Sequence, residues 1–244
     1  MSLRIWLHEG HDGGPGLVAL GLDWLGFATW AESEPELIAK LPDKARQYQA
    51  WRRHHGVGVE GDTDAERIEV VGRFTGDEIL FPPDLEPARP EDVALTIRLL
   101  DCSRADLNAV LEDAPEGAFD WNPDYKNFAP WADWRSVRAN LAHIANSETA
   151  YYATNIGFEP TLPAADPHGD WRSFLPQHRS ETLAFLNELR LSADLTRLRT
   201  IDHGFGPEDW SVRKTLRRLV SHEIVHTKSI SRVIRDYRAT HPGS

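Results

Sequence analysis

A proline-rich segment divides the chain into two parts whose apolar residues recur with different periods. The segment, FPPDLEPARP at residues 81–90, holds four prolines in ten positions and has no apolar period. Proline fixes the backbone φ angle and lacks an N–H donor, so this composition favours an extended linker. We therefore predict two domains, one over residues 1–80 and one over residues 91–244, joined by this linker.

The first part has the pattern of a small α+β domain. The runs LRIWL, GLVALGLD and GFATWAES read as short strands, and ERIEVVGRF reads as a later one. A helix is expected over residues 35–54, with Ser33 as its cap and Pro42 as a kink or break. This order predicts a ββαβ-type layer domain. The strand before the single helix is similar to that of the HicB-like small domains.

Four long amphipathic helical patterns follow the proline-rich segment. They are expected over residues 90–112, over residues 133–155, from about residue 180, and over residues 209–238. In the third, Leu183, Leu186 and Leu189 recur every three residues, and Ser180 is its expected cap. Four helices of this length indicate an up-down four-helix bundle. The predicted fold class is therefore α+β with two domains.

The second and fourth helical patterns are related by a repeat. A shift of 75 positions places Leu141 on Leu216 and Glu148 on Glu223. The repeat predicts a pseudo-symmetric bundle in which these helices are equivalent. The two glutamates are then expected to make structural contacts, with Arg138 or Arg213 as candidate partners.

Charge and composition limit the classes of function. The net charge of −11 argues against a general nucleic-acid binder, although residues 209–244 are rich in Lys and Arg. We expect this basic segment to pack against an acidic one. A single cysteine, Cys102, rules out a disulfide framework or a thiolate cluster. No apolar run suggests a signal peptide or a membrane span, so we expect a cytoplasmic protein.

The string HEIVH at residues 222–226 matches the H-E-x-x-H signature of zinc proteases. On a helix, His222 and His226 lie one turn apart on the same face, so both imidazoles can bind one metal ion. A zinc protease of this kind needs another ligand downstream, but Ser229 stands where one common pattern has its Gly and Arg232 where it has its third His, and no Glu follows. We therefore expect a non-protease whose third ligand lies upstream.

His143 is the upstream candidate, because bundle helices can present side chains to a shared interior. The alternative is that the three histidines are separate and individually hydrogen-bonded or solvated. His8 and His11 could also bind a metal ion, but solvated loop residues are the simpler reading.

Two segments carry a family resemblance. DWRSVRANLAHIANSETAYY and DWSVRKTLRRLVSHEIVHTKSI together resemble the DinB/YfiT-like superfamily over residues 90–240. The resemblance implies a four-helix bundle with a metal site at His143, His222 and His226. It further implies one divalent ion (Ni, Zn or Fe), a homodimer, and a metal-dependent enzyme that uses a small thiol in transfer, isomerisation or hydrolysis.

Two functions therefore stay open. In the first, the protein is a metal-dependent transferase, isomerase or hydrolase acting on a small-molecule substrate. In the second, it is a binding or regulatory module in which the metal is structural or sensory and the HicB-like domain binds a partner. A fourth protein ligand that closes the metal site would favour the second function.

Overall fold

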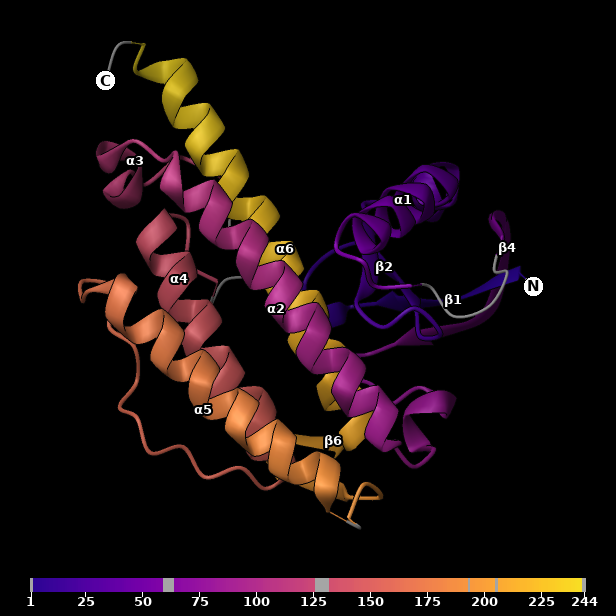
Figure 1. Cartoon of the computed structure of the whole chain (residues 1–244). Helices are drawn as coiled ribbons and strands as arrows, with labels where there is room; N and C mark the ends of the chain where they lie inside the picture. Colours follow the sequence, from indigo (N-terminus) through magenta and orange to yellow (C-terminus); the bar gives the residue numbers. More distant parts are fainter. Residues whose placement is uncertain (1, 59–63, 126–131, 193, 205, 243–244) are drawn as a thin grey trace.

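The computed structural model describes residues 2–58, 64–125, 132–192, 194–204 and 206–242. Within them, a small sheet with one helix lies beside a bundle of longer helices (Figure 1). The predicted α+β class is confirmed, with the sheet in the N-terminal part of the chain and the helices after it. Among the described helices, none is both long and apolar enough to cross a membrane.

The N-terminal unit is a four-stranded sheet in the order β3-β2-β1-β4. Its elements are β1 (Ser2–Glu9), β2 (Leu17–Gly21), β3 (Phe27–Ala31), α1 (Glu34–His54) and β4 (Asp64–Thr75). Strand β1 pairs antiparallel with β2 and parallel with β4, and α1 makes the crossover between β3 and β4. All three early runs form strands, so the sheet has one strand more than a ββαβ unit. Helix α1 continues through Pro42 rather than breaking there.

Strand β1 is buried on both faces, which explains its nearly continuous apolar run. Leu3, Ile5 and Leu7 pack in the cluster that holds Leu37 and Leu41 of α1. On the other face, residues of β1 and β2 pack against Phe81 from the proline-rich segment, and the members of that cluster are Trp6, Val18, Leu20 and Phe81. The helix and the proline-rich segment thus cover opposite faces of the sheet.

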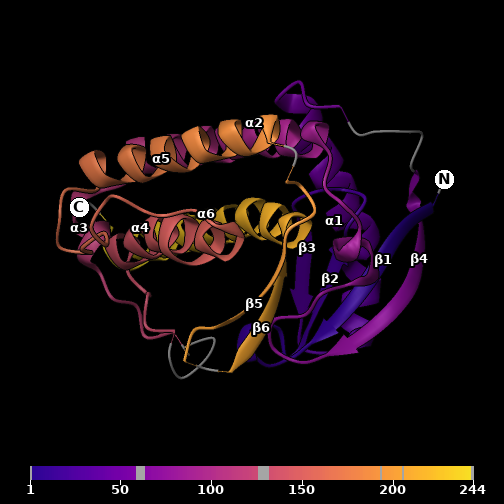
Figure 2. The same ribbon diagram turned by 90° about the horizontal axis from the view of Figure 1, so that it is seen from below.

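The C-terminal unit is built around four long helical segments. They are α2 (Pro90–Glu112), α4 (Val137–Asn146) with its continuation through a π-helix (Ser147–Ala153) and a 3-10 turn (Thr154–Ile156), α5 (Trp171–Leu191) and α6 (Val212–Thr240). Figure 2 shows α2 and α5 in one layer and α4 and α6 in the other. A short helix α3 (Glu116–Asp120) and a hairpin of β5 (Leu198–Asp202) and β6 (Pro207–Ser211) complete the unit.

The helix bounds differ from the sequence expectation at three places. The second pattern is not one α-helix, because the π-helix interrupts it before Gly157 ends it with a φ of 95°. The third begins at Trp171, where the Asp170 side chain accepts a hydrogen bond from the Arg172 N–H at 3.1 Å, and Ser180 lies inside it. The fourth begins at Val212, because the residues before it pair as strand β6.

The proline-rich segment is packed rather than fully extended. Residues Pro82–Leu85 form a 3-10 turn, and Phe81 and Asp84 are buried. Asp84 receives hydrogen bonds from the Arg217 guanidinium of α6, at 2.9 Å for the shortest. The division into domains at 81–90 stays a prediction, and this contact ties the two units together.

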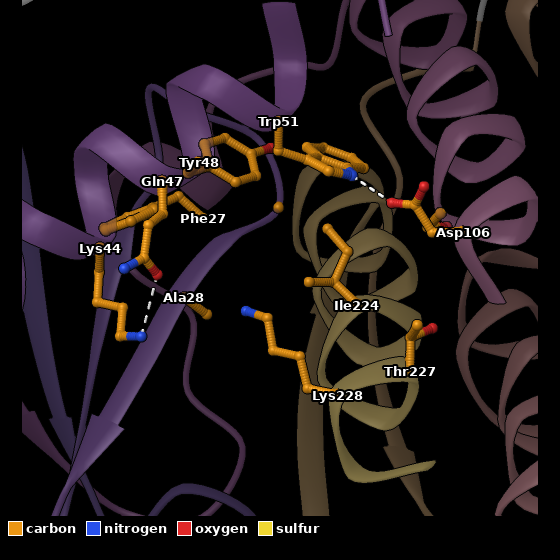
Figure 3. A pocket seen from close by; sticks show the side chains of 12 residues that line it. Phe27, Ala28, Lys44, Gln47, Tyr48, Trp51, Asp106, Ile224, Thr227 and Lys228 are labelled. Carbon is orange, nitrogen blue, oxygen red and sulfur yellow. Dashed lines mark hydrogen bonds between the residues drawn. The ribbon is translucent and has the colours of Figure 1, made fainter. Parts of the chain in front are cut away.

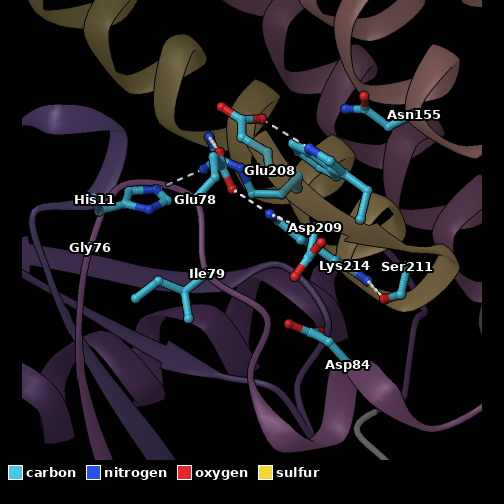
Figure 4. Close-up of polar contacts among 12 residues, drawn as sticks. His11, Gly76, Glu78, Ile79, Asp84, Asn155, Glu208, Asp209, Ser211 and Lys214 are labelled. Atoms are coloured by element: carbon cyan, nitrogen blue, oxygen red, sulfur yellow. Dashed lines mark hydrogen bonds and ion pairs between the residues drawn. The ribbon is translucent and has the colours of Figure 1, made fainter. Parts of the chain in front are cut away.

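The basic stretch of α6 packs against acidic residues near the proline-rich segment, as its charge predicts. The ammonium group of Lys214 lies 3.2 Å from Glu78, and the guanidinium group of Arg218 lies 2.8 Å from the same carboxylate. Arg213 pairs with Glu86 at 3.0 Å. Figure 4 shows Glu78 and Lys214 in this interface. The positive charges in the first two turns of α6 are thus paired with carboxylates within the fold.

Candidate metal centre

Three histidines from two helices meet inside the bundle. His143 lies on α4, and His222 and His226 lie one turn apart on α6. Their candidate ligand atoms are all within 4.8 Å of one another, and the Nε2 atoms of His143 and His222 are 2.9 Å apart. Within the described part of the chain, this is the one group of three or more His, Cys, Asp or Glu side chains placed to share a metal ion.

Asn140 fixes the tautomer of His226. The side-chain amide of Asn140 donates to the backbone carbonyls of Trp134 and Ser136, at 2.7 and 2.9 Å. Its carbonyl oxygen must therefore accept from Nδ1–H of His226, at 2.8 Å. The Nε2 lone pair of His226 is then left for a ligand role, which is how oriented metal-binding histidines are usually held.

Burial keeps the three imidazoles neutral. It lowers the pKa of His143 to about 4, and the nearby positive charge of Arg218 adds to the effect. Burial also lowers the pKa of His222 and of His226 well below the usual value. Neutral imidazoles are the form that binds a metal ion, so at neutral pH all three offer a lone pair. The chemistry of this donor set fits a divalent transition metal.

Aromatic side chains surround the cluster. The Trp134 indole stacks on His143 with ring centroids 3.5 Å apart and an interplanar angle of 11°. The Tyr152 ring meets His222 edge-on at 5.2 Å. Regular α-helical spacing would place Tyr151 two turns from His143 on the same face, but the π-helix adds a residue to the turn, and Tyr152 is the residue that contacts His222. Tyr151 donates to Glu208 at 2.8 Å.

A chain of hydrogen bonds links Arg218, whose guanidinium group lies over the Tyr152 ring, to the N-terminal sheet. Arg218 donates to Nε2 of His11 at 2.7 Å, and the Nδ1 atoms of His11 and His8 are 3.1 Å apart. Nε2–H of His8 donates to the carbonyl of Gly76 at 2.9 Å, so His8 Nδ1 must accept from His11. His8 is buried and hydrogen-bonded, not solvated as a loop residue would be. Figure 4 shows His11 close to Glu78.

Glu223 is bound elsewhere in the bundle. Its carboxylate accepts from Arg104 Nε at 2.6 Å and from Ser103 Oγ at 3.1 Å, and it also pairs with Arg179. Glu148 contacts the same two arginines. The repeat therefore correctly pairs the two glutamates in a structural role.

The arginine partners expected from the sequence were wrong. Arg138 instead pairs with Asp120 at 2.8 Å, and Arg213 pairs with Glu86. The true partners lie on α2 and α5, which the repeat between the other two helices could not indicate. Asn140 was also missed, since one Asn on an amphipathic helix gives no signal until its hydrogen bonds are known.

The sequence was compared with known families, curated proteins and solved structures. A family model described as the DinB superfamily matches residues 99–230. The match covers more than half of the chain and includes all three histidines and Asn140. No curated protein and no solved structure matches the chain.

Proposed function

The chain belongs to the DinB superfamily, and on this basis we propose that it is a metal-dependent enzyme whose ion is held by His143, His222 and His226. The observation that carries the proposal is the meeting of three neutral imidazoles from two helices, two of them half-buried and that of His226 buried. The superfamily is typically metal-binding, which supports the same reading. The matched range holds the three histidines, and the side-chain geometry brings them together.

The donor set suggests which ions suit the site. Imidazole nitrogen is a ligand for Zn, Ni and Fe, whereas Mg and Ca prefer oxygen. Three imidazoles leave at least one position of a four-coordinate ion for a small molecule. An ion bound there would act as a Lewis acid and lower the pKa of a water or low-molecular-weight thiol.

The surrounding residues have roles of their own in this proposal. Asn140 orients His226, and the stacked Trp134 ring covers one face of His143. Arg218 brings a positive charge near the histidines and is itself held by Glu78 and His11. That charge favours an anionic group on the substrate. We infer a thiol-dependent transfer, isomerisation or hydrolysis of a small molecule.

A second function is a sensory or regulatory module. The hydrogen-bond chain from Arg218 through His11 to β1 favours it, because Arg218, whose charge acts on the histidines, is joined to the N-terminal unit. In this second function the HicB-like unit binds a partner, and the metal ion either acts as a sensor or stabilises one conformation of the protein. A cytoplasmic homodimer, expected from the sequence and the resemblance, is compatible with either function.

A thiol titration separates the two functions. The protein is loaded with Co²⁺, and its visible absorption spectrum is recorded as 2-mercaptoethanol is added. We expect a saturable spectral change in wild type and none in His143→Ala. If Co²⁺ binds to wild type but the spectrum does not respond to thiol, no coordination position of the ion is open to a small molecule. The sensory or structural function is then the better account.

A further inference from the structure

A pocket lies between the N-terminal unit and the bundle. Its volume is about 180 Å³, and residues of β3, α1, α2 and α6 line it. Figure 3 shows α1 on one side and α6 on the other. On α6 the lining residues are Ile224, Thr227 and Lys228. At 100° per residue these lie on the face opposite His222 and His226, so the pocket is separate from the metal centre.

The wall of the pocket is aromatic and apolar. Tyr48 and Trp51 of α1 stack with ring centroids 5.4 Å apart, and Phe27 of β3 meets Tyr48 edge-on at 5.6 Å. Ile224 adds an aliphatic surface from α6. These side chains form an apolar wall suited to a ring or a compact branched group.

Two lysines give the pocket a positive rim. Lys44 of α1 and Lys228 of α6 enter it from opposite sides (Figure 3). Lys44 donates to Gln47 at 3.1 Å, and the structure shows no carboxylate within 4.0 Å of either ammonium group in its described part. Burial, with a contribution from Lys44, lowers the pKa of Lys228. The net charge of the chain is −11, so a rim of two positive charges stands out from the mainly negative charge of the protein.

Two other polar groups at the pocket affect which ligands it can bind. Asp106 is already engaged, because Trp51 Nε1–H donates to it at 2.5 Å and His55 lies 3.1 Å from its other oxygen. The Thr227 hydroxyl is buried and has no hydrogen-bond partner within the described part of the chain. A buried hydroxyl without a partner can donate to a polar atom of a ligand.

We propose that this pocket binds a small organic monoanion, namely a carboxylate on a single aromatic ring or on a branched aliphatic group of similar size. The carboxylate lies between Lys44 and Lys228, and the apolar body packs on Trp51 and Tyr48. The volume sets the size, since a cavity of about 150 Å³ holds benzene. A nucleotide is too large, and inorganic phosphate would leave the aromatic wall unused.

Calorimetry on the full-length, metal-loaded protein tests the proposal with benzoate, benzamide and inorganic phosphate. We expect benzoate to bind with a dissociation constant of about 1 mM or tighter, as a ligand of nine heavy atoms allows. Benzamide and phosphate should bind at least about fivefold more weakly. Absence of benzoate binding, or equal binding of either comparison compound, overturns the proposal.

Variants locate the binding. Lys228→Met keeps the aliphatic stem and should weaken benzoate binding about fivefold. Lys40→Met, one turn from Lys44 and outside the pocket, is the matched control and should leave affinity unchanged. His143→Ala should also bind benzoate normally. Loss of binding in His143→Ala places the carboxylate on the metal ion, and unchanged affinity in Lys228→Met also contradicts the proposal.

Discussion

Hydrogen-bond partners fix the protonation of the two histidines that lie between Arg218 and the N-terminal sheet. These are His8 and His11, and the acceptor on Gly76 and the donor on Arg218 leave one arrangement of ring protons. Both imidazoles must be neutral in that arrangement, since a second proton on either ring would place two N–H groups face to face or oppose Arg218. The chain therefore makes the fold sensitive to acid.

The histidine pair predicts how stability depends on pH. Burial lowers the pKa of both residues, and Arg218 adds to the effect at His11, so the unfolded chain binds more protons than the folded one below about pH 6.5. Their contribution is complete above that pH and is lost as the pH falls, by up to about 1.4 kcal/mol per pH unit for each group. Tm should fall between pH 7.5 and 5.5.

A variant isolates this contribution from that of the metal ligands. In EDTA, the fall in Tm should be smaller for His11→Gln than for wild type, by about 2–4 °C per kcal/mol in a chain of this size. Differential scanning calorimetry at both pH values gives the comparison. An equal fall in the two proteins would show that the pair does not titrate with unfolding.

The four helical segments of the bundle are joined by a buried cluster of two arginines and two glutamates. Arg104 lies on α2, Arg179 on α5, Glu148 on the π-helix and Glu223 on α6. Burial alone would raise the pKa of Glu223, but the charges of Arg179 and Arg104 outweigh it and lower that pKa. The cluster is neutral as a whole, so its members depend on one another.

Removal of one charge should therefore destabilise the fold. Glu223→Gln leaves a buried excess positive charge, and we expect it to lower the free energy of unfolding by about 3 kcal/mol. Glu148→Gln should have a similar effect. Glu188 is exposed, so Glu188→Gln should change the free energy of unfolding by less than about 0.5 kcal/mol. Urea denaturation measures all three. A negligible effect of Glu223→Gln would mean that the cluster does not hold the helices together.

The sequence indicated the elements better than the contacts between them. Apolar periodicity gave the bounds of α2, and the two motif segments gave the three histidines, because these signals are local. The π-helix at Ser147 has no such signal, and it decides that Tyr152 rather than Tyr151 faces His222. The arginines of the ion cluster are far from the glutamates in sequence, so the pairing required the packed bundle.

At the scale of the whole molecule, α6 connects the parts. One face carries His222 and His226, another carries Glu223, and Lys214, Arg217 and Arg218 contact the N-terminal unit and the proline-rich segment. A further face lines the pocket between the units. Because so many faces of α6 are packed, a change at one site can reach another only if the helix moves as a rigid body. The N-terminal unit is therefore a structural neighbour of the metal centre.

The metal content of purified variants tests the central claim most directly. Wild type and His168→Ala, an exposed loop histidine, should each bind about one divalent ion per chain when loaded with Zn²⁺ or Ni²⁺, desalted and analysed by mass spectrometry of the elements. His143→Ala and His226→Ala should retain far less than one ion while circular dichroism shows a folded helical protein. Stoichiometric metal in both histidine variants would contradict a site built from His143, His222 and His226.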